Sequence, residues 1–270
     1  MSAEDKVVED DMAAHKGSGS AASGAKEETS EIIKTVIYAL LITLVFRTLF
    51  FQPFTIPSAS MEPNLYEGDY IVVSKWDYGY SKYSFQWPLP FIKDRIFEKS
   101  AKRGDIVVFK LPRNPKVDYI KRVVGLPGDR VQMRSNQLYI NDIPVPAKSL
   151  GPVMPQISYD SQYATKYEET LPDGSTHAMQ DLRTDGPADD TPEYTVPAGH
   201  YFMMGDNRDN SIDSRYAMDD PIQPGVDFVP AENLEGRATM VLVSWKEGSS
   251  IWKPWTWLNL RWDRLFKSLK

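Results

Sequence analysis

One continuous apolar run near the N-terminus constrains this chain more than any other feature. Residues 32–51 (IIKTVIYALLITLVFRTLFF) carry only two charged side chains, Lys34 and Arg47, so a helix over them has no polar face. Such a helix extends roughly 30 Å, about the hydrocarbon thickness of a bilayer. We expect a transmembrane anchor whose two cations reach toward opposite interfaces. The alternative is a buried helix of a soluble domain.

The stretch before this run, residues 1–31, is rich in Ala, Ser, Gly and acids, with eight acids against three lysines. It predicts a disordered acidic tail rather than a secretory signal, because a long acidic lead precedes the apolar run. Basic residues near the run are slightly more numerous on its N-terminal side: Lys16, Lys26 and Lys34 against Arg47 and Lys75. This asymmetry favours a cytoplasmic N-terminus and an extracytoplasmic body.

The chain after Pro53 consists of short runs rich in Val, Ile and Tyr, bounded by Gly, Pro, Asn and Asp, which predict strands. The expected strands are 69–74, 105–109, 119–124, 130–133, 137–140, 200–204 and 238–243. No helical pattern separates them, so the fold class is mainly β, an antiparallel-sheet or barrel-like core over 52–143 and 199–245. Residues 144–198 are polar and rich in Pro and Gly, and predict a small inserted hairpin or cap.

The C-terminal segment, residues 246–270, is basic and, with Trp245, holds five of the seven tryptophans. On a helix, one face would carry Leu258, Trp262, Leu265, Phe266 and Leu269, and another Arg261, Arg264 and Lys267. Two interpretations stay open. The segment is a helix packed on the domain surface, or it contacts the membrane interface through its Trp and Arg side chains.

Composition excludes several classes of function. The chain has no cysteine, which rules out disulfides, thiol catalysis and thiolate metal sites. Its three histidines, His15, His177 and His200, give little material for a zinc site or a His-based triad. Residues 32–270 have a net charge of −1 (the total of −6 less −5 in the tail) and no basic stripe, which argues against nucleic-acid binding.

Two polar features offer groups for catalysis. In residues 56–63 (IPSASMEP), Ser58 and Ser60 point to the same side of an extended chain, although an ordinary Pro/Ser loop would look the same. In the strand 118–124 (DYIKRVV), Lys121 and Arg122 face opposite sides, so one of them is buried or paired. A lysine among apolar neighbours has a lowered pKa and can act as a general base, whereas an exposed lysine is the commoner case.

A third polar feature is the loop 205–216 (GDNRDNSIDSRY), which follows an apolar strand. Asp213 and Arg215 can form a charge-assisted pair within it, and Ser211 lies close by in the sequence. Acids at 206, 209 and 213 would suit a calcium loop, but the spacing, central glycine and closing glutamate of that motif are missing. We therefore expect no metal and no cofactor. A serine, a lysine and no available histidine suit a Ser–Lys dyad.

The chain resembles the bacterial type I signal peptidases. The resemblance covers roughly residues 32–245 and depends on the order and spacing of five motifs: RTLFFQPF from Arg47, IPSASMEP from Ile56, GDIVVF from Gly104, DYIKRVVGLPGD from Asp118 and GDNRDNSIDSR from Gly205. It implies an almost all-β catalytic core of antiparallel sheets with a smaller inserted region, which agrees with the strand prediction above.

The resemblance also implies roles for single residues. Ser60 matches the nucleophile, Lys121 the general base, and Ser58 a serine whose hydroxyl completes the oxyanion hole. Ser211 matches a serine that orients the lysine, and Asp213 with Arg215 a supporting ion pair. Positions that line shallow pockets for small side chains match Phe54, Ile56, Met61, Leu65, Ile71 and Ile120.

Departures from the family pattern are few. Ala59 stands where glycine is usual, Asn64 stands where threonine is usual, residues 217–227 are longer than usual, and one span is present where some members have two. Alanine tolerates fewer backbone conformations than glycine, which bears on the oxyanion geometry.

We therefore expect a single-pass enzyme of the cytoplasmic (inner) membrane that uses no cofactor and acts outside the cytoplasm. Its expected substrates are signal-peptide-bearing exported precursors, cut after small residues (Ala-X-Ala). We expect a monomer that contacts membrane lipids and binds no nucleic acid. One rival is a Ser–Lys peptidase with a narrow substrate, such as a pilin-type maturation protease. Another is a non-catalytic, membrane-tethered β-domain that binds export clients.

Overall fold

A computed structural model describes residues 28–85, 95–155, 163–220, 223–246, 248–249 and 253–269. The chain divides into two compact units, Met1–Arg47 and Thr48–Lys270, and each is described by itself. Most of the predicted acidic tail, residues 1–27, lies outside the described residues.

A helix covers Glu28–Leu49, and all but its last two residues belong to the first unit. Among the described residues it is the one helix long and apolar enough to cross a membrane. None of the residues in its apolar stretch is buried. It begins earlier than expected, with a Glu31–Lys34 ion pair of 2.9 Å in its first turns. The expected end of the span at Phe51 is wrong. Phe51 pairs with Ser74 as the first residue of a strand, and its ring packs edge-on against Trp76.

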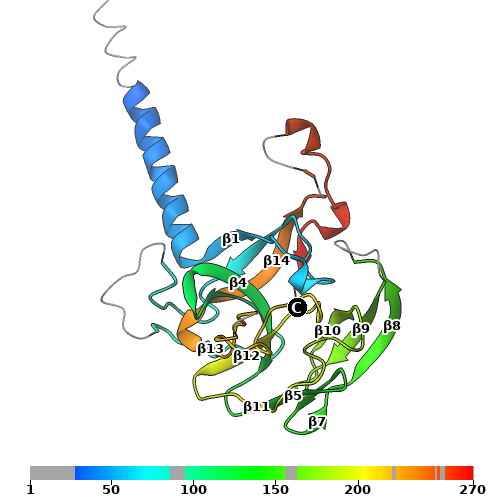
Figure 1. Ribbon diagram of the computed structural model, residues 1–270. Helices are drawn as coiled ribbons and strands as arrows, with labels where there is room; N and C mark the ends of the chain where they lie inside the picture. The colour runs from blue at the N-terminus through cyan, green and yellow to red at the C-terminus, as the bar shows by residue number, and fades with distance from the viewer. Residues whose placement is uncertain are drawn as a thin grey trace, which may run out of the picture. The chain divides into compact units, whose positions relative to one another are not determined.

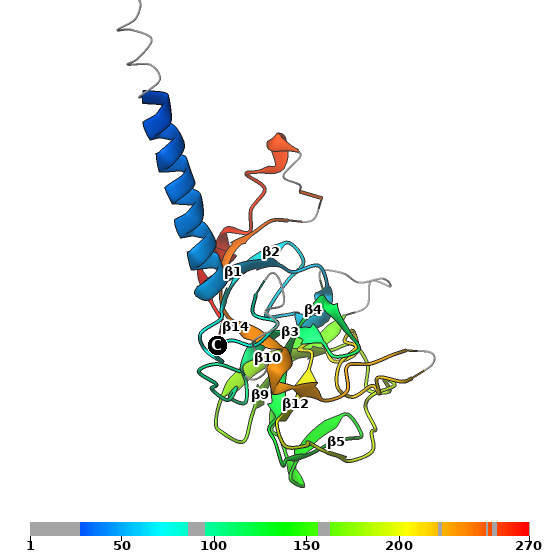
Figure 2. The ribbon, with the colours of Figure 1, turned by 90° about the vertical axis from the view of Figure 1, so that its left-hand side faces the viewer.

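The second unit is built on an eight-stranded antiparallel sheet (Figure 1). Its strand order is β1-β2-β14-β3-β4-β12-β13, with β15 also paired to β14. Figure 2 shows β1, β2 and β14 at one end of this sheet. The strands are β1 (Phe51–Thr55), β2 (Asp69–Ser74), β3 (Ile106–Leu111), β4 (Asn114–Gly125), β12 (His200–Met204), β13 (Val229–Pro230), β14 (Leu234–Ser244) and β15 (Lys267–Ser268).

Two smaller antiparallel sheets complete this unit. One has the order β11-β5-β6-β7 and the other β10-β9-β8. Their strands are β5 (Arg130–Arg134), β6 (Gln137–Ile140), β7 (Ile143–Pro144), β8 (Ala147–Val153), β9 (Ala164–Thr170), β10 (Thr176–Asp181) and β11 (Tyr194–Thr195). Positive φ angles at Ser135 and Asn136, and at Asn141 and Asp142, make the two tight turns around β6.

All seven predicted strands are present, and the mainly β, antiparallel fold class is confirmed. The strand β1 was not expected, because its aromatic residues read as the end of the span. Residues 144–198 form more than one hairpin: they contribute the three-stranded sheet, half of β7 and the strand β11 that pairs with β5. The division of the body into a core and an insert stays a prediction, since residues 48–270 form one compact unit.

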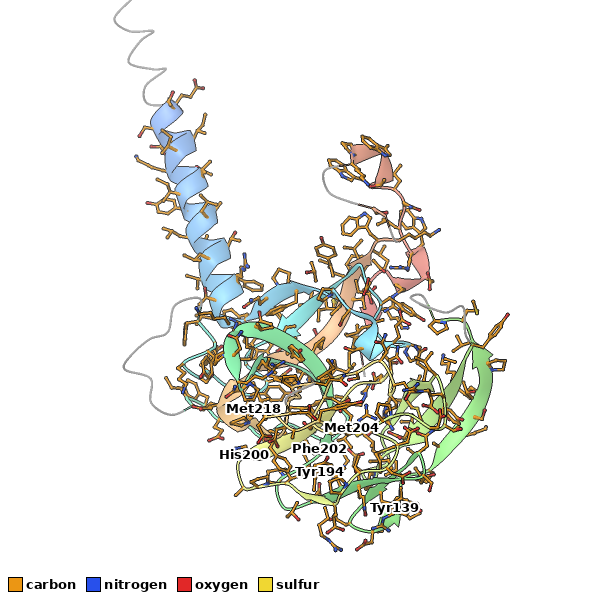
Figure 3. All side chains as sticks on the ribbon, in the orientation of Figure 1. Tyr139, Tyr194, His200, Phe202, Met204 and Met218 are labelled. Carbon is orange, nitrogen blue, oxygen red and sulfur yellow. The ribbon has the colours of Figure 1, made fainter. Side chains whose placement is uncertain are left out.

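Apolar side chains cover both faces of the main sheet. Along β3, Ile106 and Val108 belong to one buried cluster, whereas Val107 and Phe109 belong to another, as the alternation of a strand requires. A third cluster lies under the smaller four-stranded sheet, where the rings of Tyr194 and Phe202 are 5.2 Å apart (both labelled in Figure 3). This packing leaves β4 buried along its C-terminal half.

The helix considered for the C-terminal segment does not form. In its place are two short 3-10 turns, Pro254–Thr256 and Trp262–Arg264, and the strand β15 on the edge of β14. The reason is Arg264, which the helical pattern placed on a polar face. This residue is 2% exposed, and its guanidinium bonds Asp69, with 3.0 Å between Nε and Oδ1. Six large apolar side chains of the described part of this segment stay exposed: Trp255, Trp257, Leu258, Trp262, Leu265 and Phe266.

Candidate active site

Ser60 lies in a short 3-10 turn, Ala59–Met61, between β1 and β2. The turn is fixed from below by Met61 and Leu65, which have no exposed surface. Ser58 directly precedes the turn in an extended conformation, and its hydroxyl makes no hydrogen bond to the backbone of the turn. Because the first N–H groups of such a turn find no acceptor inside it, they are available to a ligand.

Lys121 reaches Ser60 from the middle of β4. Its Nζ donates a hydrogen bond to Ser60 Oγ over 2.6 Å, although the two residues are 61 positions apart in the chain. Lys121 is 4% and Ser60 8% exposed. The fold therefore brings together the two residues that the sequence selected separately.

Burial is the main influence on the Lys121 amine. It lowers the pKa of Lys121 from 10.5 to about 8, against the carboxylates of Asp213 and Asp206, which raise it, and with Arg215, which lowers it further. Near pH 8, about half of these amines are neutral. A neutral amine beside a hydroxyl can accept its proton, so this lysine is suited to general-base chemistry.

Arg122, on the opposite side of the strand, is also buried, but it is paired. Its guanidinium bonds both carboxylate oxygens of Asp206, over 2.7 and 2.8 Å, and the carbonyl of Gly104 over 2.6 Å. The sequence left open which of the two adjacent cations faces inward. Both do, and they differ in that Arg122 has a carboxylate partner and Lys121 a neutral hydroxyl.

The loop 205–216 supplies the remaining polar groups. Arg215 Nε and Asp213 Oδ1 are 2.9 Å apart in a fully buried ion pair. Burial alone would raise the pKa of Asp213, but Arg215 and the Gly205 N–H lower it below its ordinary value. Ser211 Oγ donates to Asp213 Oδ2 over 2.8 Å, so the pair also fixes this hydroxyl.

Gly205 allows Ser211 to come close to the turn that holds Ser60. A Cβ at position 205 would lie 2.2 Å from Ser211 Oγ and 2.6 Å from the carbonyl oxygen of Ser60. No other residue leaves room for this approach. The hydrogen bond recorded for Ser211 goes to Asp213, and its contact with Lys121 stays a prediction.

Two further residues were not selected from the sequence as part of the site. Asn207 donates from its backbone N–H to the carbonyl of Ser60 over 3.1 Å, and from Nδ2 to the carbonyl of Ala59 over 3.2 Å. Asn64 donates to Asp206 Oδ2 over 2.7 Å. The many Asx residues of the loop were a signal that it makes specific bonds, but the partners depend on the fold.

A cavity of about 440 Å³ opens beside the Ser60–Lys121 pair. Its lining includes Ser58, Ser60, Lys121, Asp209 and Ser211. Ser58 Oγ lies 3.4 Å from Ser60 Oγ, so the two hydroxyls share one side of the chain as expected.

One of the six predicted pocket residues lines this cavity, and the others belong to the core beside it. Ile120 lines it. Ile56, Met61, Leu65 and Ile71 belong with Ile120 to one buried core cluster, and Phe54 packs against it half-buried. Their role in recognising a substrate stays a prediction.

The loop 205–216 is also fastened to the smaller sheet. Arg208 pairs with Glu169 of β9 over 2.6 Å. The Arg208 backbone N–H donates to the carbonyl of Gln180 in β10, and the Gln180 N–H donates to the carbonyl of Asp206. Burial would raise the pKa of Glu169, yet Arg208 and His177 lower it to about 2. In the part of the chain that the structure describes, the one group with metal-ligand spacing, Asp181, Asp189 and Asp209, lies on this same junction.

We predict that the Arg122–Asp206 pair is essential for stability. In Asp206→Asn the buried guanidinium loses its counter-charge, and the free energy of unfolding should fall by about 3–5 kcal/mol. The matched control is Asp142→Asn, whose carboxylate pairs with the exposed Arg130 and Arg134 and should matter little. Denaturant unfolding of the two variants and the wild type in detergent measures both effects, and equal stability of the two variants would contradict the argument.

Comparison with known proteins adds a family to this geometry. The family model "Signal peptidase, peptidase S26" matches residues 29–245. A signal peptidase I of Rickettsia typhi is 37% identical over 251 residues, covering 86% of this chain and 90% of that protein. One from Rickettsia canadensis is 35% identical over 266 residues, covering 92% of this chain and 96% of its own length. A crystal structure of a signal peptidase I from Enterococcus faecalis V583 shares 30% identity over 52% of this chain and 98% of that one, with a TM-score of 0.30.

Proposed function

The chain belongs to the signal peptidase family, peptidase S26, and from that membership we propose that Ser60 is its nucleophile and Lys121 its general base. It is a serine endopeptidase that cleaves signal peptides from precursor proteins. One observation carries the assignment of the two residues. A buried amine and a buried hydroxyl from distant parts of the chain lie 2.6 Å apart on the wall of a cavity.

Neutral Lys121 takes the proton of Ser60 Oγ as the oxygen attacks the carbonyl carbon of the scissile peptide. The resulting ammonium gives that proton to the leaving amine, and an acyl-enzyme on Ser60 remains. Lys121 then activates the water that hydrolyses the ester. A lysine can serve because its pKa of about 8 lies near the pH of the reaction.

The oxyanion is bound by the Ser60 N–H and the Ser58 hydroxyl in this proposal. Ser58 makes no capping bond within its own turn, and it lies on the side of the chain that carries the nucleophile. Ala59 is compatible with this arrangement, since it occupies a 3-10 turn that alanine adopts without strain. The usual glycine is therefore not required here.

Ser211, Asp213 and Arg215 have a positioning role. The ion pair fixes the Ser211 hydroxyl against Gly205, next to the carbonyl of Ser60. The Asp213 carboxylate also raises the Lys121 pKa against the effect of burial. Without it the lysine would lose its proton too readily to protonate the leaving amine.

The proposed substrates are exported precursors cut after small residues at Ala-X-Ala sites. Phe54, Ile56 and Ile120 would contact the small side chains, above a floor of Met61, Leu65 and Ile71 that has no exposed surface. A floor packed at core density leaves room for a methyl group more readily than for a larger side chain.

We predict that Ser60→Ala and Lys121→Met each reduce precursor cleavage by at least about 10³-fold, because Ser60 carries the hydroxyl bonded to Lys121 and no second lysine lines the cavity among the described residues. Ser58→Ala should cost about 10²-fold through the loss of one oxyanion donor. Matched controls on the exposed strand β8 are Ser149→Ala and Lys148→Met, which should keep full activity. Cleavage of a synthetic Ala-X-Ala precursor is measured, with circular dichroism to check folding. Near-normal cleavage by either dyad variant would contradict the proposed Ser–Lys mechanism.

We also predict a rate that rises with pH through the Lys121 pKa. Below pH 8 the amine is protonated and cannot accept a proton, so the rate should fall about tenfold per pH unit and level off above the pKa. Lys121→Arg is the control, because a guanidinium stays charged and should remain inactive at every pH. Single-turnover cleavage between about pH 5 and 10 measures the profile, and a flat wild-type profile would exclude Lys121 as the base.

The helix Glu28–Leu49 is the proposed membrane anchor, in a single-pass topology of the inner membrane with the N-terminus inside and the catalytic domain on the periplasmic side. We further propose that the enzyme is a monomer with an acidic cytoplasmic tail, a catalytic core over 52–143 and 199–245, and an inserted region over 144–198. The family supports membrane attachment, and the distribution of lysines supports the orientation.

The C-terminal segment is proposed as a second lipid contact. Trp255 is 79%, Trp257 49% and Trp262 64% exposed. Residues 245–270 carry six basic residues against two acids, a net charge of +4 that would attract anionic lipid.

We predict that the unit Thr48–Lys270 binds vesicles containing anionic lipid, and that replacing the three tryptophans with Ala weakens binding at least about tenfold. High salt should also weaken it, because the attraction is screened. The fragment begins at Thr48, the first residue of the second unit, so that β1 (Phe51–Thr55) is complete. Co-sedimentation measures binding, with Trp76→Ala as a control outside the segment. If the fragment does not bind the vesicles, the proposed second lipid contact is wrong, and the helix Glu28–Leu49 remains as the proposed anchor.

A further inference from the structure

Three carboxylates converge where the smaller sheet meets the catalytic loop. Asp181 ends β10, Asp189 lies in the segment that follows, and Asp209 belongs to the loop 205–216. One oxygen from each lies within 4.8 Å of the others. Asp209 is 20 residues beyond Asp189 and belongs to a different loop, so the sequence did not predict this group.

The backbone presents these carboxylates to one another. The N–H groups of Leu182 and Arg183 both donate to Asp209 Oδ2 over 2.9 Å, which leaves Oδ1 to face the group. A Cβ at Gly186 would lie 2.2 Å from that Oδ1 and 3.2 Å from Asp189 Oδ1. The glycine therefore lets the chain close around the oxygens.

A second observation points to a ligand. Asp181 is 4% and Asp189 3% exposed, and the Oδ1 atom of each is buried with no hydrogen-bond partner. The other oxygens are satisfied, Asp181 Oδ2 by Asn136 Nδ2 over 2.6 Å and Asp189 Oδ2 by the Gly186 N–H. Buried carboxylate oxygens without a donor are costly, and a cation or a proton removes the cost.

The charge balance leads to the same need. Burial raises the pKa of Asp181 to about 7, and the Asp209 and Asp189 carboxylates raise it too, while Asn136 lowers it. Burial and Asp209 also raise the pKa of Asp189. The charges of Arg215 and Arg183 lower the pKa of Asp189. Arg215 is already paired with Asp213, however, and Arg183 is exposed to solvent. Above neutral pH the group holds negative charge that its neighbours do not balance.

We propose that Asp181, Asp189 and Asp209 bind a hard divalent cation, with Ca²⁺ fitting better than Mg²⁺. Carboxylate oxygens are the ligands that both ions prefer. Two oxygens on one Ca²⁺ can be up to about 5 Å apart, twice a bond length of about 2.3–2.6 Å, whereas on Mg²⁺ the limit is about 4.2 Å. Separations of up to 4.8 Å suit Ca²⁺ without rearrangement. Waters complete the coordination shell.

Such an ion would join the inserted sheet to the catalytic loop. Asp209 lines the active-site cavity, two residues before Ser211, and the ion would tie it to β10 beside the Arg208–Glu169 pair. The ion takes no part in the reaction. Its role is to hold the loop that positions the Lys121–Ser60 pair.

The test uses the full chain in a non-ionic detergent at about pH 8, with Ca²⁺, Mg²⁺ or EDTA. Isothermal titration should show Ca²⁺ binding, and at a free concentration of about 100 Kd the unfolding equilibrium constant should fall about 100-fold, which raises Tm by at least about 5 °C. Asp181→Asn and Asp189→Asn should lose both effects. Asp185→Asn, an exposed acid of the same segment that supplies no ligand atom, should keep them.

The variants separate this site from other acids, including those of the N-terminal tail. A Ca²⁺-induced rise in Tm that is undiminished in Asp181→Asn and Asp189→Asn would overturn the proposal. The absence of Ca²⁺ binding to the wild type up to about 10 mM, a concentration above the Kd of weak extracellular sites, would overturn it as well. Should Asp181→Asn fail to fold, Asp209→Asn provides the same comparison. A Tm that rises on acidification but ignores Ca²⁺ would overturn it too, by showing that a shared proton occupies the site instead. Binding and Tm do not depend on peptidase activity, so this test is independent of the proposed dyad.

Discussion

The burial of two adjacent cations in one strand is the constraint on which the site depends. A strand directs consecutive side chains to opposite faces, and β4 is covered on both, so neither Lys121 nor Arg122 reaches bulk water. The fold treats them differently. Arg122 receives a bidentate carboxylate from Asp206, whereas Lys121 receives the neutral hydroxyl of Ser60. In the proposed mechanism, this difference in partners makes Lys121, and not Arg122, the base.

The loop 205–216 makes that difference structurally possible. Asp206 bonds Arg122, Asn64 and, through its backbone, Gln180, so one residue connects β4, the segment after Ser60 and the smaller sheet. Asn207 then holds the carbonyls of Ala59 and Ser60 from the other side. Because each of these groups is buried, displacing the loop would leave several polar atoms unsatisfied at once. The Ser60 turn, which holds the proposed nucleophile, is thus positioned mainly by residues distant in sequence.

The sequence predicted the parts of the fold that depend on local pattern. Alternating Val and Ile runs identified the strands, and the Ser and Lys motifs selected Ser60 and Lys121, which the fold brings within 2.6 Å of each other. It did not predict contacts that only the tertiary fold creates, such as Asn64 with Asp206 or Asp181 with Asp209. The C-terminal segment shows the physical reason. Its helical pattern was overridden by one buried ion pair, Arg264 with Asp69, and by strand pairing to β14.

The burial of Lys121 without a directly bonded carboxylate has a cost that changes with pH. With a folded pKa of about 8 against 10.5 for the free group, the unfolded chain binds the extra proton between these values. Below pH 8, burial of the ammonium costs about 3 kcal/mol relative to the neutral amine, and the fold regains this as pH rises toward 10.5. The contribution of Lys121 to stability and the fraction of neutral Lys121 therefore both increase as the pH rises. A carboxylate bonded directly to Lys121 would stabilise the ammonium but keep the amine protonated, so the neutral hydroxyl partner is the compromise that the chemistry requires.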